Sequence, residues 1–221
     1  YDLKNNLTYE YQTTSAFTKE IVHHGILSRG QDVMPRIERE LLAKENAQWS
    51  GDWVEKRLTK IVGKLSSENK TIATMESCTG GQLASEITNI SGASEILRES
   101  YITYSNEAKI KCGVSKEIIK KYSVYSAETA VEMANAVCNL AGCDIGVGIT
   151  GQGRGQGRGQ GRIDPNNPGA NDNEVWYAVK FKENDSCVVR KLTILRESSR
   201  AGKKKIVVEA IVDTLYELLV K

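Results

Sequence analysis

The fold of this chain is decided by residues 71–88, TIATMESCTGGQLASEIT. The apolar part, 71–75, predicts a short buried strand, and the part after the glycine pair predicts the start of a helix. Between them, Ser77 stands on a tight turn, and Gly80 and Gly81 let a ligand approach the backbone closely. The free N–H groups at the start of a helix can stabilise negative charge. The turn therefore predicts a nucleophile or an anion site.

Strand and helix signals alternate around this turn. Strands are predicted at 70–76, 100–105, 143–150, 174–182 and 186–195, and helices at 79–90, 106–112, 115–122, 126–142 and 198–220. Apolar residues at helical spacing from Trp49 to Leu65 add an amphipathic helix in front. The Val/Ile/Gly run 144–150 predicts a central strand buried on both faces. Because the segment 174–195 reads as a hairpin, we predict a mixed sheet in a three-layer α/β/α sandwich over residues 46–221.

Residues 1–45 differ from the rest of the chain. They are polar and contain both histidines, His23 and His24. The segment 35–43 has a helical pattern, with a proline well placed in its first turn. We therefore predict two parts, a mainly helical N-terminal extension, 1–45, and the α/β domain, 46–221.

Composition restricts the function classes. The 221 residues include 30 Lys and Arg against 28 Asp and Glu, a net charge of +2 that argues against a general nucleic-acid or membrane binder. No apolar run reaches the roughly 18 residues of a membrane helix. The five cysteines are an odd number without a C-x-x-C pair, which argues against a disulfide framework or a zinc site. We therefore expect a reducing, cytoplasmic environment.

One segment has low complexity. Residues 151–162 read GQGR three times, which predicts a mobile loop. Its arginines, Arg154, Arg158 and Arg162, could gather around an anion, although a loop without function is the simpler reading. RNA binding ranks last, because three arginines give only weak affinity with a shallow salt dependence.

A second informative segment is YITYSNEAK, residues 101–109. Either residue of the pair 105–106 can cap a following helix, which puts Tyr104 and Lys109 near the end of one strand. If that strand neighbours the first one, Ser77 meets both residues in the crevice at the strand ends. A serine nucleophile needs a base. Both histidines lie far away in the extension, so Lys109, with a pKa lowered by burial, is the better candidate. On spacing alone, all three residues also fit purely structural roles.

The segments 73–81, ATMESCTGG, and 101–109 together closely resemble the CinA C-terminal domain family. The best-known members of that family are nicotinamide mononucleotide deamidases. Further similar segments are 90–94, 113–115, 124–130 and 148–151, so the resemblance covers about residues 50–215. It implies an amidohydrolase that converts nicotinamide mononucleotide to nicotinic acid mononucleotide and ammonia. It also implies a homodimer or larger homo-oligomer, and no metal or redox cofactor is required.

The resemblance also implies roles for single residues. Ser77 resembles the nucleophile, Lys109 its base and Tyr104 the supporting tyrosine. The residues expected to bind substrate are Thr79, Gly80 and Gly81, through N–H groups for the oxyanion, Thr150 at the end of the central strand, and Arg200 for the phosphate.

The chain departs from the family after the central strand. Family members usually carry a loop of the type IAGPGGG there, and residues 151–173 replace it with the GQGR repeat and a proline-rich run. This change leaves the substrate open. The alternative function is a family member that binds a nucleotide or a protein partner without turnover.

Overall fold

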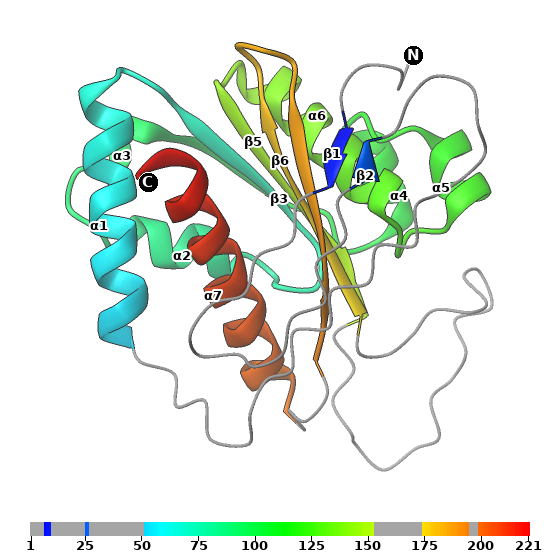
Figure 1. Ribbon diagram of the computed structural model, residues 1–221. Helices are drawn as coiled ribbons and strands as arrows, with labels where there is room; N and C mark the ends of the chain where they lie inside the picture. The colour runs from blue at the N-terminus through cyan, green and yellow to red at the C-terminus, as the bar shows by residue number, and fades with distance from the viewer. Residues whose placement is uncertain (1–6, 10–24, 27–50, 153–173, 195–198) are drawn as a thin grey trace.

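The computed structural model describes residues 7–9, 25–26, 51–152, 174–194 and 199–221. The strands are β1 (Leu7–Tyr9), β2 (Gly25–Ile26), β3 (Ile72–Glu76), β4 (Leu97–Ile102), β5 (Ile145–Gly151), β6 (Glu174–Phe181) and β7 (Cys187–Thr193). The helices are α1 (Gly51–Ser67), α2 (Gln82–Thr88), α3 (Ala93–Ile96), α4 (Asn106–Lys111), α5 (Lys116–Tyr122), α6 (Ala127–Ala141) and α7 (Arg200–Leu219). Figure 1 shows their arrangement.

The strands form one sheet in the order β2-β1-β7-β6-β5-β3-β4. Strand β3 runs parallel to both of its neighbours, β4 and β5, whereas β5, β6 and β7 are antiparallel. The predicted mixed sheet is therefore confirmed. Strand β4 begins at Leu97, three residues before the start that the sequence predicts. It is an edge strand with mostly exposed side chains, so charged residues such as Arg98 and Glu99 replace the apolar alternation.

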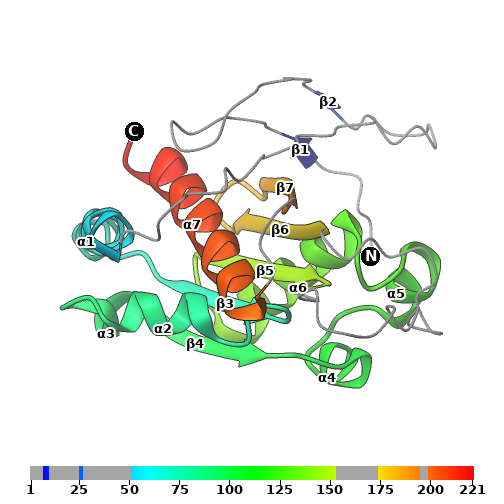
Figure 2. The ribbon, with the colours of Figure 1, turned by 90° about the horizontal axis from the view of Figure 1, so that it is seen from below.

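Helices cover both faces of the sheet, which confirms the three-layer α/β/α sandwich. Helices α1, α2, α3 and α7 lie on one face, and α4, α5 and α6 on the other (Figure 2). Strand β5 is fully buried between them, as predicted. A Cβ on Gly148 would overlap the carbonyl oxygen of Ala130, and one on Gly146 would overlap that of Ala134. These glycines therefore let α6 pack directly on the backbone of the central strand.

Little of the N-terminal extension is described. Its described parts are the short strands β1 and β2, and β1 pairs in parallel with β7 at the sheet edge far from β4. The helix predicted at 35–43, the boundary at 45/46 and Trp49 lie outside the described residues. Within those residues, no helix has the length and apolar character needed to cross a bilayer.

Candidate active site

The end of β3 carries two polar residues that are buried on different sides. Side chains alternate along a strand, so Glu76 faces the layer of α2 while Ser77 faces that of α4. The N–H of Ser77 donates to the carbonyl oxygen of Ile149 at 3.0 Å, which ties the turn to the central strand. Both residues are nearly inaccessible, with 0% of Glu76 and 6% of Ser77 exposed. The sequence therefore places a fixed serine hydroxyl at the carboxyl ends of the inner strands β3 and β5.

Glu76 holds the start of α2. Its carboxylate accepts hydrogen bonds from the N–H groups of Gly81 at 3.0 Å, Leu83 at 3.3 Å and Ala84 at 2.9 Å. The N–H of Gly80 donates to the carbonyl oxygen of Ser77 at 3.1 Å. The N–H groups of Gly80 and Gly81 are thus already used, which corrects our expectation that they serve an oxyanion. The chain's own carboxylate occupies the anion position that the helix start offers.

Lys109 reaches Ser77 from α4. The side chain of Ser105 caps this helix by accepting a hydrogen bond from the N–H of Ala108 at 3.1 Å, so the predicted cap is confirmed. Lys109 is 1% exposed, and its Nζ lies 3.1 Å from Ser77 Oγ and 2.7 Å from the carbonyl oxygen of Thr103. The serine and the lysine are therefore in direct hydrogen-bond contact.

The environment of Lys109 favours its neutral form. Burial lowers the pKa of its amine from 10.5 to about 8. A thiolate at Cys78 would oppose this effect, but burial raises the pKa of the Cys78 thiol to about 12. Because that thiol is neutral near pH 8, we take burial to be the dominant influence. A lysine with such a pKa is partly neutral near physiological pH and can accept a proton from the serine.

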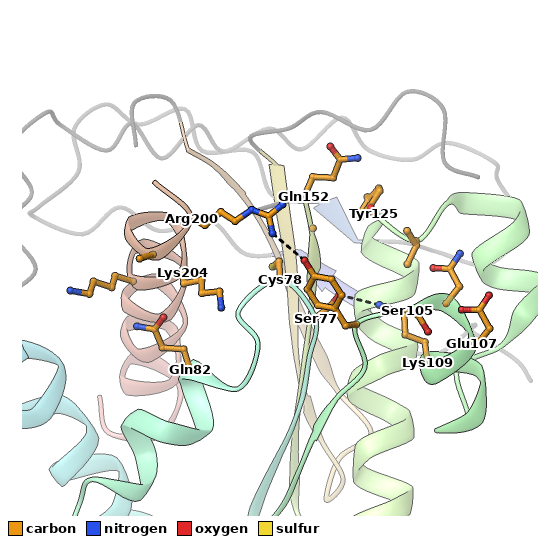
Figure 3. A pocket seen from close by; sticks show the side chains of 16 residues that line it. Ser77, Cys78, Gln82, Ser105, Glu107, Lys109, Tyr125, Gln152, Arg200 and Lys204 are labelled. Carbon is orange, nitrogen blue, oxygen red and sulfur yellow. Dashed lines mark hydrogen bonds between the residues drawn. The ribbon is translucent and has the colours of Figure 1, made fainter. Parts of the chain in front are cut away.

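A cavity of about 810 Å³ opens above the pair, and Ser77, Lys109, Tyr104 and Arg200 all line it (Figure 3). Arg200 begins α7, and its Nη1 lies 3.4 Å from the hydroxyl of Tyr104. Tyr104 is 65% exposed at the mouth of the cavity. The structure thus brings together four of the residues that the sequence predicts, from the ends of β3 and β4 and the starts of α4 and α7.

The other predicted residues lie beside the cavity. The described residues that line the cavity do not include Thr79, Gly80, Gly81 or Thr150. Thr150 is fully buried, and its hydroxyl donates to the carbonyl oxygen of Val124 at 2.6 Å. Thr150 therefore positions the segment before α6 and does not line this cavity.

The sequence analysis did not name every lining residue, and Lys204 and Gln152 are two that it missed. Lys204 lies one helical turn after Arg200, and this i, i+4 spacing could have revealed it. Its Nζ lies 3.0 Å from the place that a Cβ would take on Gly80, so it reaches the turn after Ser77. Gln152 lines the cavity although it belongs to the GQGR repeat. The predicted arginine cluster of that repeat, residues 154–162, lies outside the described residues.

Solved structures share this fold. A CinA superfamily protein of Klebsiella pneumoniae is 24% identical with a TM-score of 0.65, over 75% of this chain and 97% of that chain. A CinA superfamily protein of Escherichia coli is 24% identical with a TM-score of 0.66, over 80% of this chain and 95% of that chain.

Curated relatives are closer in sequence. A CinA-like protein of Kosmotoga olearia is 44% identical over 116 residues, and a protein of Clostridium acetobutylicum named for competence-damage inducibility is 41% identical over 153 residues. These matches cover 52% and 68% of this chain but only 28% and 35% of the relatives, so the chain corresponds to a part of them. Residues 54–218 match the CinA C-terminal domain. The chain therefore belongs to the CinA C-terminal domain family.

Proposed function

We propose that this protein is an amidohydrolase that removes the amide nitrogen of nicotinamide mononucleotide as ammonia. One observation carries the proposal: Lys109 Nζ, buried and with a lowered pKa, lies 3.1 Å from Ser77 Oγ. A serine activated by a lysine is suited to acyl transfer. The neighbouring cavity of about 810 Å³ has room for a small organic substrate.

The reaction has two halves. Ser77 Oγ attacks the carboxamide carbon while Lys109 Nζ takes the hydroxyl proton. Lys109 then gives this proton to the leaving nitrogen, the C–N bond breaks and ammonia departs. A water attacks the resulting ester and gives a proton to Lys109. The C–Oγ bond breaks, Lys109 returns the proton to Ser77, and nicotinic acid mononucleotide is released.

In each half of the reaction, the attack on the carbonyl carbon creates an oxyanion, which needs hydrogen-bond donors. Within the described residues, the N–H of Cys78 makes no backbone–backbone hydrogen bond, and Cys78 lines the cavity. This N–H replaces those of Thr79, Gly80 and Gly81 as the donor that we propose.

The phosphate is assigned to the start of α7. Arg200 and Lys204 both line the cavity there. The side chain of Ser199 caps this helix by accepting a hydrogen bond from the N–H of Gly202 at 2.9 Å. Two cations at the start of a 20-residue helix attract a phosphate through charge and through the helix dipole.

Ammonia release from nicotinamide mononucleotide tests the proposal. We expect Ser77→Ala to reduce the rate by about a thousandfold or more, because the nucleophile is lost. Ser85→Ala is the matched control, since Ser85 is an exposed residue of α2 outside the cavity, and it should keep the wild-type rate. Wild-type protein that releases no ammonia would refute the proposal. If it then still bound the nucleotide, it would be a binding protein without turnover.

A further inference from the structure

Gln152 has an unused buried acceptor at the cavity. The residue follows β5 directly, is 6% exposed and lines the cavity. Its Oε1 is buried and has no hydrogen-bond partner among the described residues. Buried carbonyl oxygens of side chains are nearly always paired, because an unpaired one loses its hydration without compensation. This oxygen therefore points to a missing donor.

The backbone fixes where this donor must be. The N–H of Gln152 donates to the carbonyl oxygen of Glu174 at 3.3 Å, so β6 holds the residue in place. The N–H of Ser77 donates to the carbonyl oxygen of Ile149, which lies in β5 three residues before Gln152. At about 3.3 Å per residue, the backbone of Gln152 lies about 10 Å further out than this anchor. In Figure 3, the Gln152 side chain lies at the top of the view, well away from Ser77 and Lys109. The missing donor is therefore not the group that Ser77 attacks.

We infer that Gln152 binds the ribose hydroxyls of the nucleotide substrate. This inference rests on the proposed function, which puts the carboxamide at Ser77 and the phosphate at Arg200. A phosphate has only acceptor oxygens near neutral pH and cannot satisfy Oε1, whereas a sugar hydroxyl can donate to it. A pair of hydroxyls can also accept from the Nε2 of the same side chain, so a ribose diol complements both ends of the glutamine.

This role distinguishes Gln152 from a residue that only fills space. Methionine has nearly the same shape as glutamine but neither donates nor accepts a strong hydrogen bond. With nicotinamide mononucleotide, Gln152→Met should lower kcat/KM by about tenfold, the usual effect of losing one buried polar contact. With the 2′,3′-dideoxy analogue, wild type and variant should differ by less than about twofold, because the contact is absent in both.

Gln82→Met is the matched control, since Gln82 lines the same cavity from the start of α2. Any effect of this substitution should be equal for the two substrates. Equal losses on both substrates for Gln152→Met would overturn the inference, because the residue would then act through packing.

A binding measurement separates this inference from the proposed function. Calorimetry with ribose 5-phosphate needs no amide and no turnover. Gln152→Met should weaken its binding by about tenfold, while the affinity for inorganic phosphate stays unchanged. If this pattern appears but no ammonia is released, the proposed function fails and the sugar contact stands. If ammonia is released but ribose 5-phosphate binds equally to both proteins, or to neither, the inference is wrong.

Discussion

Replacing Lys109 by methionine should make the protein inactive and, near neutral pH, more stable. Lys109 is 1% exposed, and its pKa is lowered from 10.5 to about 8. The folded protein therefore binds this proton less tightly than the unfolded chain does. At 1.36 kcal/mol per pKa unit, keeping Lys109 protonated in the folded state costs about 3 kcal/mol of stability below pH 8.

Methionine removes this cost and introduces a smaller one. The carbonyl oxygen of Thr103, which accepts from Lys109 at 2.7 Å, loses its donor. An unpaired buried acceptor costs about 1–2 kcal/mol. At pH 7, we therefore expect Lys109→Met to raise the free energy of unfolding by about 1–2 kcal/mol.

The effect should reverse with pH. Above about pH 10.5, Lys109 is neutral in both the folded and the unfolded state, so its burial no longer costs a charge. The wild type regains its stability relative to the variant between pH 8 and pH 10.5. At the upper end, we expect Lys109→Met to be less stable than the wild type by about 1 kcal/mol, through the unpaired carbonyl alone.

Urea unfolding of both proteins from pH 7 to pH 10.5 measures the difference between their free energies of unfolding. The titration of groups that both proteins share cancels in this difference. Lys111→Met is the control for replacing a lysine of the same helix, since Lys111 is exposed. A difference for Lys109→Met that stays constant over this range would refute the reasoning, because burial would then not hold the pKa low.

Three further predictions concern the base, the central strand and helix α1. The kcat/KM of the wild type should rise about tenfold between pH 7 and pH 9 and then level off, as Lys109 with a pKa of about 8 loses its proton; a flat profile would exclude Lys109 as the base. Gly148→Ala should destabilise the fold by about 2 kcal/mol or more, because the new Cβ would overlap the backbone of α6. Gly63→Ala, at an exposed site in α1 where no atom of the described residues lies within 4 Å of the new Cβ, should instead stabilise the fold by about 0.5–1 kcal/mol in thermal unfolding.

The predictability of each element follows from how it is buried. Strands β3 and β5 lie under helices on both faces, so their apolar runs reveal them within two residues. Helix α3 has only four residues, which is too short for a helical period to be recognised.

The candidate site could likewise be predicted only in part from the sequence. Ser77 and Lys109 could be paired because strand ends converge at one edge of a sheet. The role of Glu76 depends on α2 folding back over it, and no local pattern in the sequence carries that information.

The GQGR repeat shows why the boundary of the site could not be found from the sequence. Its period of four predicts a mobile loop over residues 151–162. In the structure, Gly151 belongs to β5 and is paired with Val175, and the N–H of Gln152 donates to Glu174. The start of β6, which lies outside the repeat, provides the backbone partners of these two residues. The sheet therefore positions Gln152, and any substrate group that it binds is held by the rigid part of the fold.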